Sequence, residues 1–221
     1  MPQIRDERTG TDELIRDGSY HYAALLADPD AAHLAPLVKK RLDALSAAQA
    51  DMHKAELGRI EVQALAERAE YQHDRRQSVL ELEVLAAVGR SRKNPAYQEV
   101  YPHGLSELLS LSGEEQEHAT VGLLQKLKQH HPDLWKTHSK ELTKLAQDAT
   151  AAEKALKKAQ VEESRAFLDE QAARAELVRQ LRKNEGALIS LYPGERGAIR
   201  LYYRQPKKRA SPAASPAPHP A

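Results

Sequence analysis

The chain has 221 residues, 33 Lys and Arg against 32 Asp and Glu, and only 5% aromatic residues. This near-neutral charge excludes a strong overall attraction to nucleic acid or to an anionic membrane. The absence of cysteine excludes disulfides, thiolate zinc ligands and cysteine nucleophiles. Ala, Leu, Glu, Lys, Arg and Gln dominate, which is typical of long helices and coiled coils.

Residues 1–10 are charged and have no apolar stretch, so we expect them to be disordered and predict no secretion signal. No window of the sequence approaches eighteen apolar residues, and we therefore predict no membrane span. Together these features lead us to expect a soluble, cytoplasmic protein. They say nothing yet about a partner.

A short helix is predicted after Thr11, which can act as its N-cap. Asp28-Pro29-Asp30 would end this helix and open the next element. From Leu37 to about Arg90, apolar residues recur at steps of three and four, which predicts a long amphipathic helix. Gly89 would mark its end, because glycine readily takes the left-handed conformation of a helix C-terminus.

The connection that follows contains Asn94-Pro95 and is predicted to be irregular. Ser112 and Glu115 fit a capping box, which would open a helix that stops at His131-Pro132. A second long helix is predicted over Leu134–Lys183, roughly 75 Å long at 1.5 Å per residue. It is expected to fray near Asn184–Gly186, before a turn, a short last helix and a disordered tail over 204–221.

The two halves of the chain show similar landmarks in the same order. Each half has a short helix, a Pro-Asp pair, a long helix, an Arg-Lys-Asn sequence and a Tyr-Pro pair. The recurrence predicts an internal duplication within one helical domain, 11–203, with pseudo-repeats over about 11–102 and 113–193. The alternative is chance, since Pro-Asp turns and basic helix ends are common.

Each long helix has an apolar stripe that it cannot cover alone, and the other long helix is the nearest matching partner. We therefore predict an all-α fold, an elongated antiparallel helical bundle or coiled coil of two long helices with short flanking helices. The stripe leaves open a parallel arrangement, and it leaves open whether the helices meet within one chain or between two.

Five polar residues fall on or near the stripes. They are Arg59, His73 and Arg76 on the first long helix, and Glu163 and Glu170 on the second. Opposite charges on the two helices predict pairing that fixes their alignment more than it stabilises them. In the alternative interpretation the stripes drift and these charges face solvent.

Two Glu-x-x-His sequences are weak candidates for metal ligands, Glu70 with His73 and Glu115 with His118. In ferritin-like bundles, two such sequences and two further glutamates hold a di-metal site, so a di-metal carboxylate bundle is one alternative function. Chance explains such pairs well in a chain rich in Glu with ten His. We predict neither a metal nor a cofactor, and His130, His131 and His138 have no nameable fourth ligand for zinc.

No Gly-x-Ser-x-Gly or Gly-rich phosphate loop occurs, so the sequence favours a non-enzymatic protein. Our prediction is a helical scaffold or protein–protein interaction protein that binds a partner protein or a second copy of itself. Weak nucleic-acid binding through the basic C-terminal segment around Lys207, Lys208 and Arg209 is an alternative, although so few charges argue against nucleic acid as the partner. The residues predicted to make contacts are the Tyr-Pro turns and the start of the tail, namely Tyr101, Pro102, Tyr192, Pro193, Tyr202, Tyr203, Lys207, Lys208 and Arg209.

Overall fold

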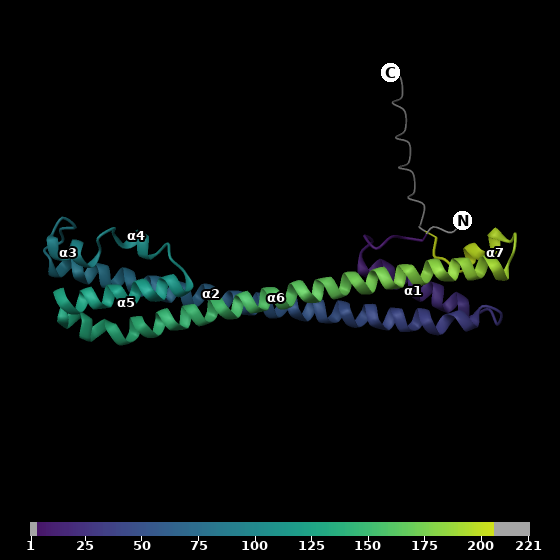
Figure 1. Ribbon diagram of the computed structural model, residues 1–221, viewed down its shortest axis with the longest axis horizontal. Helices are drawn as coiled ribbons and strands as arrows, with labels where there is room; N and C mark the ends of the chain where they lie inside the picture. The colour runs from purple at the N-terminus through teal and green to yellow at the C-terminus, as the bar shows by residue number, and fades with distance from the viewer. Residues whose placement is uncertain (1–3, 206–221) are drawn as a thin grey trace, which may run out of the picture. The chain divides into compact units, whose positions relative to one another are not determined.

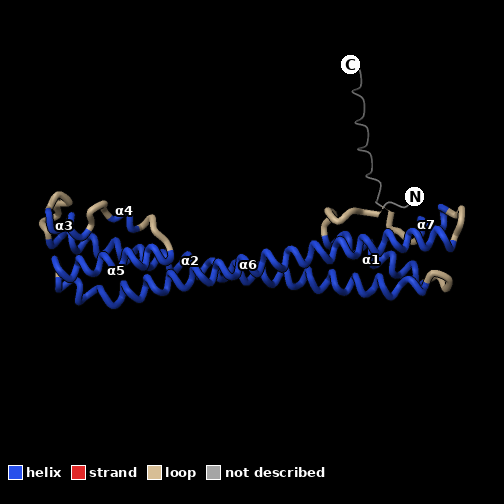
Figure 2. The backbone as a smooth tube through the Cα atoms, in the orientation of Figure 1, coloured by secondary structure: helices blue, strands red, loops and turns tan. Residues whose placement is uncertain are grey.

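The computed structural model describes residues 4–205, which form helices joined by loops and contain no strand (Figure 2). The all-α prediction is therefore confirmed for this part of the chain. The elements labelled in Figure 1 are α1 (Thr11–Leu26), α2 (Ala35–Ala87), α3 (Pro95–Val100), α4 (Leu105–Leu108), α5 (Gly113–His130), α6 (Pro132–Leu191) and α7 (Arg196–Leu201). A short 3₁₀ helix, η1 (Ala32–Leu34), lies between α1 and α2. None of them combines the length and the apolar character that a helix needs to cross a bilayer.

The chain divides into two compact units. Unit 1 joins Met1–Asp51 with Phe167–Ala221, and unit 2 is Met52–Ala166, so α2 and α6 each contribute to both units. Within each unit the stretch of α2 packs against the stretch of α6, as predicted for the two long helices. In unit 2 these stretches run antiparallel, because later residues of α2 pair with earlier residues of α6: Arg59 pairs with Glu163 and Arg76 with Glu141.

The core of unit 1 forms where α1 packs against the first part of α2 and the last part of α6. Leu14 and Leu25 of α1 are fully buried among leucines of the two long helices. Gly18 lies at the closest approach, since a Cβ at this position would be 2.7 Å from Leu42 Cδ2 and 3.2 Å from Leu177 Cδ2. The absence of a side chain at Gly18 therefore allows α1 to pack closely against both long helices.

The core of unit 2 forms where α5 packs against the last part of α2 and the first part of α6. The buried leucines and valines of these helices are joined by Tyr97, Val100 and Tyr101, which come from α3 and the residue after it. α3 is a helix where we predicted an irregular connection. Its N-cap is Asn94, whose side chain accepts a hydrogen bond from the Ala96 N–H at 3.0 Å.

α6 is longer than predicted, because it continues through Gly186 to Leu191 instead of fraying at Asn184. Asn184 and Leu188 are both buried in unit 1, and their contacts stabilise the last two turns against the cost of a glycine in a helix. Asn184 thus lies inside a helix, whereas Asn94, its counterpart among the sequence landmarks, caps one. The internal duplication stays a prediction.

Two predicted helix caps differ in the structure. The N-cap of α1 is Gly10, and Thr11 is the first helical residue, whose buried hydroxyl donates to the carboxylate of Glu170. Ser112 is the N-cap of α5 but makes no capping hydrogen bond through its side chain. The capping box does not form because Gly113 takes a left-handed backbone, with φ of +57°, at the entry to the helix.

Candidate functional site

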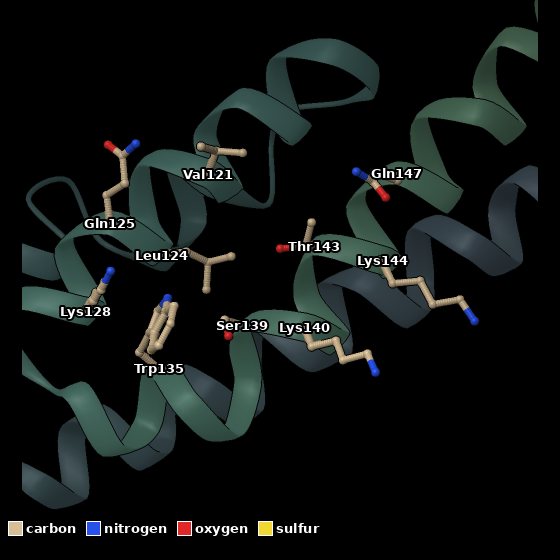
Figure 3. A pocket seen from close by; sticks show the side chains of 10 residues that line it. All are labelled: Val121, Leu124, Gln125, Lys128, Trp135, Ser139, Lys140, Thr143, Lys144 and Gln147. Atoms are coloured by element: carbon tan, nitrogen blue, oxygen red, sulfur yellow. The ribbon is translucent and has the colours of Figure 1, made fainter.

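An open groove of about 640 Å³ runs between α5 and α6 in unit 2 (Figure 3). Its lining residues, which define the α5/α6 groove, are Val121, Leu124, Gln125 and Lys128 of α5 and Trp135, Ser139, Lys140, Thr143, Lys144 and Gln147 of α6. The two helices form a hairpin because α5 ends at His130 and Pro132 begins α6 after a single residue. The groove therefore lies between two directly connected antiparallel helices.

The spacing of the buried residues explains why these side chains line the groove. His138 and Leu142 of α6 are buried in unit 2, and Ser139 and Thr143 follow each of them by one position. On α5, Leu124 and Lys128 follow the buried Leu123 and Leu127 in the same way. One residue along an α-helix is a rotation of about 100°, so the groove residues form the face beside the core-facing stripe.

The floor of the groove is apolar. Trp135, the only Trp in the chain, is half-buried and packs against the unit 2 core, while the side chain of Leu124 is almost fully buried. Figure 3 shows both side chains directed into the space between the helices. Val121 extends this floor and is 46% exposed. Trp135 and Val121 thus remain partly accessible on either side of the buried Leu124 in one concave strip.

The rim of the groove is positively charged. Lys128, Lys140 and Lys144 are exposed, and no lining residue is acidic. Lys128 Nζ lies 5.0 Å from the centroid of the Trp135 ring, within the range of a cation–π contact. Within residues 4–205 none of the three lysines forms an ion pair, whereas Lys154, further along α6, pairs with Glu114 at 2.8 Å. The rim therefore carries three lysines without an ion-pair partner in the described part of the chain.

The tyrosines that we predicted as contact points are mostly interior residues. Tyr101 is buried in unit 2 and stacks on Tyr97, with ring centroids 5.3 Å apart. Tyr202 and Tyr203 are buried in unit 1, where the Tyr203 hydroxyl donates to the Leu181 carbonyl at 3.0 Å. In a chain with one Phe and one Trp, tyrosine supplies the aromatic bulk of both cores.

Tyr192 is half-buried and, with Tyr202, donates a hydrogen bond to the carboxylate of Asp28. These two bonds stabilise the ionised carboxylate and lower the pKa of Asp28. The prolines of the two turns, Pro102 and Pro193, are exposed. The basic residues Lys207, Lys208 and Arg209 lie outside the described residues.

The polar residues predicted on the stripes reach several different partners. Arg59 Nε lies 2.8 Å from Glu163 Oε2, so these two residues pair between α2 and α6. Arg76 pairs with Glu141 at 2.6 Å instead of with Glu163 or Glu170. Glu170 is almost buried and accepts the hydrogen bond of Thr11. Both long helices therefore carry interhelical polar contacts along the predicted seam.

The residues of the two Glu-x-x-His sequences have separate environments. His73 is buried and its Nε2 lies 3.0 Å from the Thr120 hydroxyl, whereas Glu70, Glu115 and His118 are exposed. Burial lowers the pKa of His73, although the neighbouring Asp74 carboxylate acts in the opposite direction. Within residues 4–205, no group of three or more His, Asp or Glu side chains is placed to hold a metal ion.

A second buried histidine, His21, forms the polar centre of unit 1. Its Nδ1 lies 2.9 Å from the Tyr202 carbonyl, and its Nε2 lies 3.0 Å from the Asn184 amide nitrogen. The carbonyl requires a proton on Nδ1, so Nε2 is the acceptor and the ring is neutral. Burial lowers the pKa of His21 to about 4, in keeping with this arrangement.

Sequence reasoning missed the α5/α6 groove. Five lysines, Lys126, Lys128, Lys136, Lys140 and Lys144, surround the single Trp within about twenty residues, and only Asp133 and Glu141 oppose them. That local excess of positive charge beside an aromatic residue was a usable signal. No protein-family model matches the sequence, and no curated protein or solved structure is similar enough to the chain to be matched.

Proposed function

We propose that this chain is a non-enzymatic helical scaffold that binds a partner protein in the α5/α6 groove. The observation that carries the proposal is the apolar floor of Trp135, Leu124 and Val121, bordered by lysines that form no ion pair within the described residues. Exposed apolar patches with polar rims are characteristic of interaction sites, and Trp is enriched among the residues that dominate binding energy.

The support of the groove suits this role. Both of its walls are helices, and each wall packs through buried leucines, such as Leu127 of α5 and Leu142 of α6, onto the core of unit 2. A site built on packed helices keeps its geometry better than a site built on loops. The lining residues are therefore held in a preformed arrangement, which reduces the entropy lost on binding.

Site-specific photocrosslinking in cells tests the proposal. A photoreactive phenylalanine derivative replaces Gln125 or Ser139, which line the groove, and in a control variant it replaces Leu82 of α2, which is 64% exposed and outside the groove. We expect both groove variants, and not the control, to form an adduct of one discrete protein mass. An adduct with a second copy of the chain also supports the interaction function and identifies the partner.

Three outcomes contradict the proposal. Adducts that form equally at Leu82 show nonspecific collisions, adducts that nuclease removes show a nucleic-acid ligand, and the absence of protein adducts from both groove positions shows an unused surface. Circular dichroism of each purified variant confirms that it retains its helix content before the cells are compared.

A further inference from the structure

The length of the α5/α6 groove matches a helix. On α6 its lining residues run from Trp135 to Gln147, which is about 18 Å at 1.5 Å per residue. On α5 they run from Val121 to Lys128. A strip between two antiparallel helices is a natural seat for one more helix, whose side chains fit between those of its neighbours. An occupant of three to four turns would cover the exposed floor.

The positions of the lysines define the charge of this occupant. Lys140 and Lys144 are four residues apart on α6 and therefore lie one above the other on the same face. Lys128 belongs to the opposite wall, beside Trp135. Carboxylates one turn apart on the occupant would meet the two lysines of α6, and a further carboxylate would meet Lys128.

Several lysines of unit 2 outside the groove form ion pairs. Lys154 lies 2.8 Å from Glu114, and Lys157 lies 2.6 Å from Glu153. These lysines find acids on their own helix or on α5, whereas the rim lysines face a concave surface without acids. Complementary charge across an interface mainly determines specificity and the rate of association.

We propose that the α5/α6 groove binds an amphipathic helix of a partner protein, with an apolar stripe seated on Trp135, Leu124 and Val121 and with acidic residues one turn apart facing Lys140 and Lys144. This inference rests on the proposed function and specifies the chemistry of the partner. It predicts an association that weakens with salt, since the rim lysines are exposed and their charges are screened.

A fluorescence titration of the full chain tests the proposal, because its only Trp lies in the groove. The probe is a synthetic helical peptide of about four turns, free of Trp, with leucines along one face and pairs of glutamates one turn apart. The matched peptide has Gln in place of each Glu. We expect the Glu peptide to shift the Trp emission to shorter wavelength and to bind about tenfold more tightly than the Gln peptide at low salt.

Charge reversal locates the site. The variant with Lys140→Glu and Lys144→Glu should lose the preference for the Glu peptide and should bind a peptide with Lys in place of Glu. The matched control is Lys40→Glu, since Lys40 is an exposed lysine of α2 in unit 1 that forms no ion pair within the described residues. We expect this control to bind like the original chain.

The outcomes separate the two proposals. Equal binding of the Glu and Gln peptides, or no effect of the double reversal, overturns the acidic-helix inference, while groove-specific protein crosslinks would still support the interaction function. Failure of every peptide to change the Trp emission also overturns the inference. A single-stranded DNA oligonucleotide that shifts the emission when the peptides do not overturns it in favour of a nucleic-acid ligand.

Discussion

Units 1 and 2 bury corresponding positions of their short helices but fill them with different side chains. The buried residues of α1 are Thr11, Leu14, Gly18, His21 and Leu25, and those of α5 at the same spacing are Gly113, Gln116, Thr120, Leu123 and Leu127. The long helices repeat this relation, with Glu170, Leu177, Val178 and Leu181 in unit 1 and His73, Leu80, Glu81 and Val84 in unit 2. One packing geometry therefore accommodates two different sets of polar residues.

The polar groups of unit 1 are largely paired. His21 has partners on both ring nitrogens, and Asp28 accepts bonds from two tyrosines. At the other end of α1, Arg204 bridges Glu13 at 2.9 Å and Asp17 at 3.0 Å. These contacts join the beginning of the described chain to its end and leave few buried groups unpaired.

Unit 2 is less completely paired. Of the six buried side-chain polar atoms without a hydrogen-bond partner in the described residues, Arg174 Nε alone belongs to unit 1, while the others belong to Arg76, Gln77, Tyr101, His131 and His138. Unpaired buried groups reduce stability, and regions of lower stability often carry function. The same unit holds the open, positively rimmed groove. The comparison thus shows that most of the unpaired buried atoms lie in the unit that holds the groove.

Leucine truncation in the two cores gives the largest expected effect. Leu80→Ala in unit 2 and Leu177→Ala in unit 1 occupy corresponding positions, and each should cost about 2–5 kcal/mol of unfolding free energy through a buried cavity. Because the single Trp belongs to unit 2, Leu80→Ala should lower the Trp-detected denaturation midpoint more than Leu177→Ala does. Equal shifts would show that the units unfold as one and would remove the energetic distinction between them.

Acidification should lower the stability of unit 1 through protonation of His21. Its pKa is near the ordinary value of 6.5 in the unfolded chain and about 4 in the folded one, so only the unfolded chain binds this proton between these values. Stability contributed by the neutral ring is present above pH 6.5 and falls by about 3 kcal/mol as the pH approaches 4.

His21→Gln isolates this contribution, whereas His73, whose pKa is also lowered, remains in both proteins. Chemical denaturation at a series of pH values should give a shallower loss of stability on acidification in the variant. The two proteins are compared by the slope of their unfolding free energy against pH. A loss of stability that the substitution causes equally at every pH does not change this slope. Parallel curves would contradict the neutral state of the buried ring.

Two glycine substitutions distinguish the short helices α1 and α5, and a third in α2 serves as a reference. Gly113→Ala should cost about 1–3 kcal/mol, because the residue has a positive φ that strains any side chain, even if the flexible Glu153 carboxylate moves away from the new Cβ. Gly18→Ala should cost less, since the flexible end of Leu42 can move aside. Gly58→Ala, with no atom near the new Cβ, should stabilise by up to about 1 kcal/mol. Thermal denaturation should rank the three variants in this order.

The ion pair of Arg59 and Glu163 should give the smallest effect. Its side chains are 24% and 23% exposed, and a double-mutant cycle should give a coupling energy of about 0.2–1 kcal/mol that decreases with salt. The pair of Arg76 and Glu141, whose glutamate is 54% exposed, should couple more weakly. A coupling of several kcal/mol would show that these charges stabilise the seam instead of only aligning it.

Much of the fold was predictable, because it follows from local chemistry. Apolar spacing of three and four predicts both long helices, and Gly89, with a φ of +76°, follows the end of α2. The continuation of α6 was not predictable in this way, since the contacts that carry it beyond Asn184 come from His21, 163 residues away in the sequence. The helix-breaking tendency of Gly186 favoured an earlier end of α6, but the tertiary contacts of the following turns outweigh it.

The candidate site was less predictable than the fold. Tyr101, Tyr202 and Tyr203 have polar tips, and sequence alone does not say whether such a residue lies at a surface or in a core that lacks other aromatics. The groove depends on which face of α6 the core leaves uncovered. That face is known only once α2 and α5 are positioned, although Trp135 and its surrounding lysines were visible from the start.

The connectivity of the two units has a consequence for biosynthesis. Unit 2 is one continuous stretch, whereas unit 1 requires Asp28 to meet Tyr202, which is 174 residues further along the chain. Since synthesis proceeds from the N-terminus, every segment of unit 2 emerges from the ribosome before the last part of α6 does. We expect α1 to remain exposed to chaperones and proteases until then, and protease digestion of ribosome-bound chains of increasing length should show unit 2 becoming protected first.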